Sequence, residues 1–383
     1  MDDVHLRIES SICALLRGES VTWPTSKDPE FEVRFRDCVA YHGVGHLLSR
    51  QFSISRTRGC DVSDPRRMAP ELKDEMAIEL ARKHELVRVL TALAESGARA
   101  LLLKGVALAY SIYPSPALRP RADTDLLIRS ADRDLTARTL SELGYKKSNT
   151  VSGELVMYQC GFVRRDRFGI DHVLDVHWRV SNTQSFSQAL DYEELSLRSV
   201  HLAALGKHAR GLAAADALLL ACMHRAHHFH SPYWVDGMAR SGGDRLIWLY
   251  DIHLLVNAMS PRALGAFVRL AETKGMRTVC SDGLLRARQC FGTRIPDDVL
   301  LPLASKEPAE ASAAHLREGS IRHLLTELRS LPHWRDRLSL VGEHLFPPSD
   351  YMLEKYAATN RVRLPMLYLQ RGIHGTWKRI RKP

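Results

Sequence analysis

The spacing of apolar and polar residues changes twice along this chain. Between residues 71 and 90, apolar residues recur every three or four positions with charged residues between them, which is typical of an amphipathic helix. From residue 98 to 210, short apolar runs alternate with helical patterns, and from 211 the spacing is helical again. We therefore expect a helical N-terminal region (1–97), an α/β core (98–210), a helical C-terminal domain (211–344) and a proline-containing basic tail (345–383), extended or partly helical.

In the predicted core, the spacing of apolar residues predicts individual strands and helices. Strands are predicted at 100–103, 124–129, 156–163 and 171–180, and helices at 106–113 and 132–143, the latter capped by Gly144. The charged segment 164–169 predicts a hairpin between the last two strands. The clearest later helices are predicted at 213–229, 245–258, 261–274 and 281–290. The predicted fold class is α+β, with helical regions on both sides of the core.

Composition and charge narrow the class of protein. The 383 residues, 45% of them apolar, can bury two or three cores. Seven scattered cysteines without CxxC spacing argue against a disulfide framework and a thiolate zinc site. The acidic start and the short apolar runs predict no membrane span and a cytoplasmic location. A net charge of +10 favours an anionic partner, but a nucleotide, an RNA, an anionic glycan and an acidic protein all satisfy it.

Three aspartates and a Lys-Gly pair carry the candidate chemistry. Asp123 and Asp125 are two positions apart at a predicted strand, so their side chains point to the same side. Asp175 lies inside a later strand of otherwise apolar and aromatic residues. Lys104 and Gly105 occupy a strand-to-helix turn, where glycine permits close approach and helix amides favour a phosphate. A carboxylate pair alone is common by chance, and the ordered set makes the pattern specific.

This arrangement suits phosphoryl chemistry with two Mg²⁺ ions, for which Mn²⁺ is an alternative. Such ions take oxygen ligands and neutralise phosphate charge. We expect Asp123 and Asp125 to bind both ions, and Asp175 to bind the ion that activates an acceptor hydroxyl and to help deprotonate it. Arg119 and Arg121, just before the aspartate pair, are further candidates for phosphate or base contacts.

These residues resemble the polymerase-β-like nucleotidyltransferase superfamily, in particular its bacterial branch of uncharacterised nucleotidyltransferase family proteins with a Lys-Gly first motif. The resemblance spans residues 98–180. Lys104-Gly105 stands where most of the superfamily has Gly-Ser, Asp123 and Asp125 look like the metal-binding pair, and Asp175 is similar to the third carboxylate. The resemblance implies a small mixed sheet flanked by helices, and transfer of a nucleoside monophosphate from a nucleoside triphosphate to an acceptor hydroxyl with release of pyrophosphate.

The predicted C-terminal helices add a second set of polar residues. His224 and His228 are four positions apart on one helix, and Asp251 lies on the next. We expect a His-Asp pairing between these helices, with an acceptor-pocket or structural role, while zinc is a weaker alternative because no third ligand has a fitting position. The acceptor stays open among a small molecule, a sugar, an RNA and a protein. Two rival functions are a non-catalytic nucleotide- or RNA-binding protein that keeps the fold, and a scaffold for protein contacts.

Overall fold

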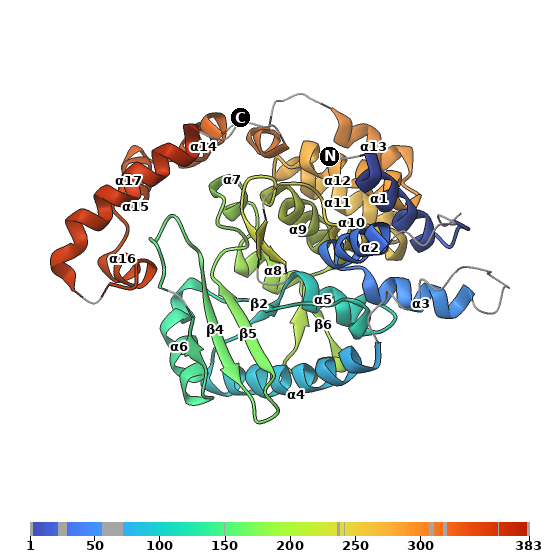
Figure 1. Ribbon diagram of the computed structural model, residues 1–383, viewed down its shortest axis with the longest axis horizontal. Helices are drawn as coiled ribbons and strands as arrows, with labels where there is room; N and C mark the ends of the chain where they lie inside the picture. Colours follow the sequence, from blue (N-terminus) through green and yellow to red (C-terminus); the bar gives the residue numbers. More distant parts are fainter. Residues whose placement is uncertain are drawn as a thin grey trace.

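The computed structural model describes residues 3–21, 29–55, 72–148, 150–235, 238–240, 242–305, 310–316, 320–358 and 360–380. A mixed sheet lies between long helices, and the chain ends in a helical arm (Figure 1). The predicted α+β class is confirmed. Within the described part of the chain, no helix combines the length and the apolar character needed to cross a membrane.

The sheet has seven strands in the order β3-β4-β5-β2-β1-β7-β6. Its central strands β2 (Thr124–Leu127) and β5 (Asp171–His177) run parallel, whereas β1 (Leu101–Leu102) is antiparallel to β2 and parallel to β7. The remaining strands are β3 (Lys146–Lys147), β4 (Gln159–Arg165), β6 (Val200–His201) and β7 (Arg210–Gly211). The sheet therefore mixes both directions, and the parallel pair β2-β5 lies near its centre.

Successive residues of the central strands face two different apolar cores. Leu102 and Leu126 belong to a core with α4 (Leu72–Ser96) and α6 (Arg133–Glu142), which cover one face of the sheet. Leu101 and Leu127 belong to a larger core with the C-terminal helices. Because side chains alternate along a strand, Asp125 lies on the same side as Leu127 and faces the C-terminal helices. The sheet thus presents Asp125 to the C-terminal helices of the larger core.

The larger core contains residues of the first three helices and of the C-terminal helices. Residues of α1 (Asp3–Leu16), α2 (Pro29–His42) and α3 (Gly45–Ser55) pack in the same cluster as those of the C-terminal helices. The helical N-terminal region therefore divides, because α4 packs on the sheet instead. The C-terminal helices are α9 (Ala214–His227), α10 (Leu246–Ala258), α11 (Pro261–Thr273), α12 (Arg277–Phe291) and α13 (Asp297–Ala304).

Shorter elements connect these layers. They are the helices α5 (Lys104–Ser111), α7 (Gln184–Ser187) and α8 (Tyr192–Arg198) and the two-stranded ribbon β8 (Tyr233–Val235) and β9 (Met238–Arg240). Gly144 ends α6 with a φ of 86°, and Tyr145 N donates to Leu140 O at 3.0 Å across it, which confirms the predicted glycine cap.

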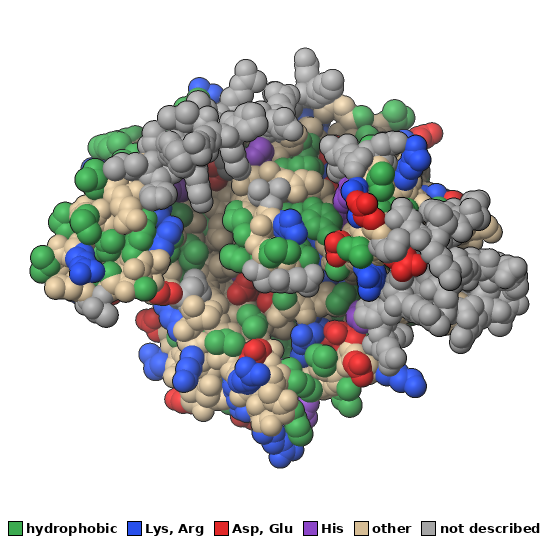
Figure 2. Space-filling view, in the orientation of Figure 1, with side chains coloured by type: hydrophobic (Ala, Val, Ile, Leu, Met, Phe, Trp, Pro, Cys, Tyr) green, Lys and Arg blue, Asp and Glu red, His purple; other side chains and the backbone are tan. Residues whose placement is uncertain are grey.

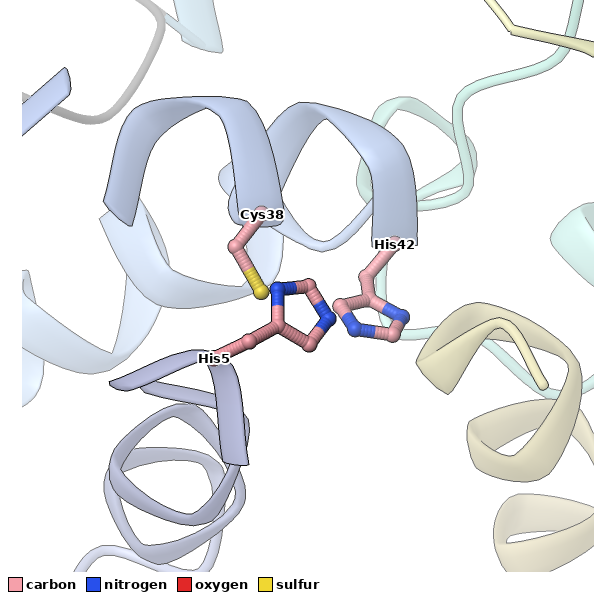
Figure 3. Close-up of side chains that lie close together, drawn as sticks. All are labelled: His5, Cys38 and His42. Carbon is pink, nitrogen blue, oxygen red and sulfur yellow. The ribbon is translucent and has the colours of Figure 1, made fainter. Parts of the chain in front are cut away.

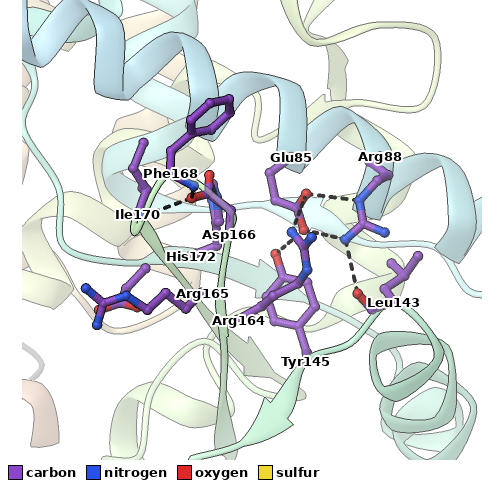
Figure 4. Close-up of polar contacts among 11 residues, drawn as sticks. Glu85, Arg88, Leu143, Tyr145, Arg164, Arg165, Asp166, Phe168, Ile170 and His172 are labelled. Carbon is purple, nitrogen blue, oxygen red and sulfur yellow. Dashed lines mark hydrogen bonds and ion pairs between the residues drawn. The ribbon is translucent and has the colours of Figure 1, made fainter.

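The predicted hairpin forms between β4 and β5 and is tied to α4 through Glu85. The Glu85 carboxylate accepts hydrogen bonds from Arg88 at 2.6 Å and from the Tyr145 hydroxyl at 2.9 Å, and Arg164 of β4 lies 3.1 Å away (Figure 4). At the hairpin tip, Asp166 accepts two backbone N–H groups. Burial opposes ionisation of Glu85, but the bonds from Arg88 and Tyr145 bring its pKa below the usual range. Glu85 thereby holds the hairpin onto α4.

The C-terminal arm consists of α14 (Ser320–Ser330), α15 (Trp334–Leu345), α16 (Ser349–Lys355) and α17 (Leu364–Ile380). It returns to the core through acidic residues: Glu343 accepts from Leu155 N at 2.8 Å, and Glu354 from Thr150 N at 2.9 Å. The described part of the tail is thus largely helical. Side chains from residue 373 onward, including the predicted basic end, lie outside what the structure describes.

Six of the seven cysteines are free, namely Cys13, Cys38, Cys160, Cys222, Cys280 and Cys290. The seventh, Cys60, lies outside the described residues.

Candidate active site

Two of the three predicted carboxylates lie side by side on the central strands. Asp125 of β2 and Asp175 of β5 are direct partners in the parallel ladder, and Leu127 is paired with His177 two residues on. Asp123 immediately precedes β2. Residues two apart share a side of the sheet, so this group faces the C-terminal helices. Segments fifty residues apart in sequence therefore meet at one point of the sheet.

Lys104 adds a cation to this group from the first residue of α5. Its Nζ lies 2.6 Å from Oδ1 of Asp125, with both side chains largely buried. Its backbone has a φ of 47°, in the left-handed region that non-glycine residues rarely adopt, a conformation that costs energy and is concentrated at functional sites. The strained turn directs the lysine side chain to the aspartates.

The N-terminus of α5 is open to an anion. Its N-cap residue Leu103 provides no side-chain hydrogen bond, so the first N–H groups of the helix are not capped in that way. Gly105, buried in the first turn, has no side chain, and a Cβ there would lie 3.6 Å from the guanidinium of Arg119. This local structure suits the phosphate contact expected of Lys104 and Gly105.

His177 is a site residue that the sequence prediction did not name. Its Nε2 lies 2.9 Å from Oδ1 of Asp125, so this oxygen is shared by an imidazole and an ammonium group. The signal was available, because His177 follows Asp175 by two positions on the same strand and must lie on the same side. Asp175 has a polar neighbour of its own, since Gln159 Nε2 donates to its Oδ2 at 3.2 Å.

The electrostatics of the three carboxylates diverge. Lys104 and His177 outweigh burial at Asp125 and hold its pKa well below the usual range. Burial, followed by repulsion from Asp123 and Asp125, raises the pKa of Asp175 to about 7. Burial and the charge of Asp125 raise the pKa of Asp123 to about 6. The site therefore has more negative charge than its own cations compensate.

This imbalance and the donor set fit a divalent cation. Ligand atoms of Asp125, Asp175 and His177 all lie within 4.8 Å of one another. Carboxylate oxygens are the donors that Mg²⁺ prefers, and an ion here would relieve the repulsion that raises the pKa of Asp175. Asp123 lies outside this compact set of three, although its charge acts on both Asp175 and Lys104.

The two arginines have partners other than those expected. Arg119 is buried and forms a bidentate ion pair with Asp251, with its Nε and Nη2 atoms at 2.9 and 2.8 Å from the carboxylate oxygens. The hydroxyl of Tyr113 donates to the same carboxylate at 2.6 Å. Arg121 is paired with Glu79 of α4. Both guanidinium groups thus pair with carboxylates and join the sheet region to neighbouring helices, while Nε and Nη2 of Arg121 have no hydrogen-bond partner among the described residues, and the phosphate contacts expected of the two arginines stay a prediction.

The histidines of α9 also differ from expectation. His224 Nε2 and His228 Nε2 are 3.1 Å apart, and the His228 ring stacks on Trp248 of α10 with centroids 5.0 Å apart. Asp251 is occupied by Arg119 and Tyr113, so the predicted His-Asp pairing is wrong for the described residues. The physical reason is that an arginine satisfies a buried carboxylate with two parallel bonds, which one imidazole cannot do.

A second cluster of metal-ligating side chains joins α1 to α2. The rings of His5 and His42 face each other with the Cys38 thiol beside them, and their ligand atoms lie within 4.8 Å (Figure 3). Leu246 N donates to Nδ1 of His42 at 3.1 Å, so the neutral ring carries its proton on Nε2. Burial raises the pKa of Cys38 to about 12 and lowers that of His42 to about 3. An uncharged cluster fits these groups, because an ion at Nε2 would require His42 to lose its only ring proton.

A family model described as an uncharacterised nucleotidyltransferase matches residues 34–292, about two thirds of the chain. No curated protein matches the chain. The matched region runs from α2 to the end of α12, so it contains the sheet, the aspartate cluster and the helices that face it.

Proposed function

The chain belongs to the uncharacterised nucleotidyltransferase family, and on that premise we propose that it transfers a nucleoside monophosphate from a nucleoside triphosphate to an acceptor hydroxyl. The observation that carries the proposal is the pairing of Asp125 with Asp175 beside Lys104, at the N-terminus of α5. This geometry combines ligands for cations with a helix terminus that favours phosphate.

Each residue has a distinct role in the proposal. Asp123, Asp125 and Asp175 would hold two Mg²⁺ ions, with Mn²⁺ as a substitute. When bound, these ions neutralise the phosphate oxygens and make the acceptor hydroxyl more acidic. Lys104 and the backbone amide of Gly105 hold the triphosphate, while Gln159 orients Asp175 through its hydrogen bond. Arg119 has a positioning role, because its ion pair with Asp251 holds α10 against the segment that precedes β2.

The reaction is an in-line substitution at phosphorus. The acceptor oxygen forms a bond to the α-phosphorus, and the bond from that phosphorus to the oxygen bridging the α- and β-phosphates breaks. The electron pair leaves with pyrophosphate, and the hydroxyl proton passes to Asp175. Lys104 lies where it can balance the charge of the leaving group. The products are a nucleotidylated acceptor and pyrophosphate, and nothing is oxidised or reduced.

Surface charge bears on the rival proposal of a nucleic-acid-binding protein. On the described part of the face in Figure 2, lysines and arginines are interspersed with acidic side chains and do not form one continuous basic stripe. A non-specific RNA-binding protein depends on such a stripe. The support for the enzyme comes from the buried acidic cluster of Asp123, Asp125 and Asp175.

Calorimetric titration of the full chain with MgATP and the other three triphosphates tests the proposal. We expect Mg²⁺-dependent binding that is lost in Asp123→Asn and in Asp175→Asn. The matched control is Asp171→Asn, an exposed aspartate at the start of the same strand β5, which should bind like the wild type. Equal binding by Asp175→Asn and the wild type would contradict the proposed site.

A second measurement separates an enzyme from a nucleotide-binding protein. Labelled triphosphates are incubated with the protein and a lysate, and pyrophosphate release and transfer of label are followed. Label on an acceptor, absent with Asp175→Asn, supports transfer. Tight Mg²⁺-dependent binding without pyrophosphate release under any condition would support the non-catalytic alternative.

A further inference from the structure

A cavity of about 230 Å³ lies beside the aspartate cluster, between α5, α9 and α10. Most of its wall is aliphatic, with Leu108, Ile112, Leu202, Leu212, Leu220 and Leu255 among the lining side chains, and Trp248 adds an aromatic ring. The first residue of α5, Lys104, also lines it, and its Nζ contacts Asp125. Lys104 therefore lies between the cavity and the aspartate cluster and contacts both.

Small residues on one face of α9 create this space. Ala214, Ala217, Ala221 and His224 follow one another at helical spacing and all line the cavity. The opposing helix α5 contributes Ala107 and Ser111. The three alanines of α9 are exposed or half-buried, although neighbouring residues of the same helix, such as Leu218 and Leu219, are completely buried. A helix face of alanines leaves room that larger side chains would fill.

The polar groups of the cavity gather where it meets the site. Lys104, His224 and the ion pair of Arg119 with Asp251 line it there. The charge of Lys104 acts on His224, which places these two residues near each other. A ligand that fills the cavity thus meets hydrogen-bonding groups at one end and hydrocarbon elsewhere.

Hydrogen bonds fix which nitrogen of His224 is available. His228 Nδ1 lies 3.3 Å from the carbonyl oxygen of Ser231, which can only accept, so His228 carries its proton there. His228 Nε2 then accepts from His224 Nε2, 3.1 Å away. Nδ1 of His224 is left as an unprotonated acceptor, and no described residue donates to it. Burial, together with His228 and Lys104, keeps the pKa of His224 well below its usual range, so the ring stays neutral.

We propose that this cavity binds the acceptor, and that the acceptor is a small alcohol with a compact apolar body. Its hydrocarbon part fills the space between α5 and α9, and its hydroxyl lies at the polar end, where it donates to Nδ1 of His224 in the absence of nucleotide. A cavity of about 150 Å³ holds benzene, so 230 Å³ holds a body of about nine heavy atoms. The acceptor assignment rests on the proposed nucleotidyl transfer, whereas binding of the alcohol does not.

The probe is 2-phenylethanol, and propylbenzene is its match of similar size without a hydroxyl. Ligand-observed NMR titrations are made with the full chain in the absence of nucleotide. We expect Ala221→Leu, which fills the cavity, to weaken binding of both probes by about tenfold or more. The matched control is Ala258→Leu, the same change at an exposed position of α10, which should leave binding unchanged.

A second variant tests the hydrogen bond separately from the shape of the cavity. His224→Phe keeps an aromatic ring but has no acceptor nitrogen, so binding of 2-phenylethanol should weaken by about fivefold while that of propylbenzene does not weaken. A merely structural role of His224 would change both probes alike. Equal binding of 2-phenylethanol by Ala221→Leu, His224→Phe and the wild type would overturn the proposal.

MgATP binding measured on the same variants separates this proposal from the proposed function. If Ala221→Leu remains folded by circular dichroism and binds the alcohol weakly but MgATP normally, the cavity is an alcohol site separate from the nucleotide, which supports its assignment to the acceptor. If it loses MgATP instead, the cavity holds the nucleotide base and the inference is wrong. If the wild type binds the alcohol but never MgATP, the cavity stands as an alcohol site and nucleotidyl transfer fails.

Discussion

Lys104 is the principal cation among the aspartates, and its replacement by methionine has a calculable effect. The change removes the charge but keeps a side chain of similar length. At 2.6 Å and an effective dielectric constant of about 20, its attraction to Asp125 amounts to about 6 kcal/mol. Desolvation of the ammonium group offsets part of this, and removal of one partner of a buried pair typically costs 3–5 kcal/mol. We expect Lys104→Met to lower the free energy of unfolding by about 3 kcal/mol at pH 8 without divalent ions.

The loss should depend on pH and on magnesium. At pH 5, Asp123 and Asp175, with pKa values of about 6 and 7, are protonated, so fewer negative charges are left uncompensated and the loss should be smaller. At pH 8, Mg²⁺ should restore more stability to Lys104→Met than to the wild type, because the ion no longer competes with the ammonium group.

Urea unfolding at pH 5 and pH 8, with and without Mg²⁺, measures these differences. Lys147→Met is the matched control, because Lys147 is exposed on β3. It should unfold like the wild type under every condition. Equal losses at both pH values, or a Mg²⁺ response no larger than that of the wild type, would refute the electrostatic account of Lys104.

Three further predictions follow from the same structure. Because the folded-state pKa values of Asp123 and Asp175 lie above those of the unfolded chain, their contribution to stability is complete below about pH 4 and is lost as pH rises through about 7; relative to the double variant Asp123→Asn/Asp175→Asn, the ion-free wild type should therefore lose stability in urea unfolding from pH 5 to pH 8, and Mg²⁺ at pH 8 should reverse the loss. Arg119→Leu should cost about 3–5 kcal/mol by leaving Asp251 buried and unpaired, and the double variant with Asp251→Leu should recover part of it; additive losses in denaturant unfolding would contradict this coupling. Glu85→Ala should release the β4-β5 hairpin from α4 and destabilise the protein by about 2–4 kcal/mol, with faster amide hydrogen exchange in β4; unchanged exchange there would refute the anchoring role.

The sequence predicts the sheet region well because its signals are local. The strands that contain Asp125 and Asp175 are short, mostly apolar runs, and both form where expected. Periodicity does not show which strands are neighbours; the family resemblance predicted a third carboxylate at Asp175, and the parallel register of the two strands is seen in the structure. His177 could have been added by the same alternation rule.

The sequence does not predict which distant side chains form ion pairs with each other. Arg119 and Asp251 are separated by 132 positions, and each has a plausible alternative partner close by in sequence. The choice depends on which helices approach the sheet. The same limit applies to the N-terminal region, where the helical pattern is equally clear in α1 and α4 but the two helices belong to different cores.

The shared core of the first and later helices has a consequence for synthesis on the ribosome. Apolar residues such as Ile8, Phe35 and Leu48 belong to the same core as helices that begin at Leu246, about 200 residues later. At 5–20 residues per second, they wait roughly 10–40 s for these partners. The sheet and α4 can be completed during that delay. The apolar side chains of α1, α2 and α3 are therefore exposed in the nascent protein until the later helices are made. We expect chaperones that act early in translation to bind this segment.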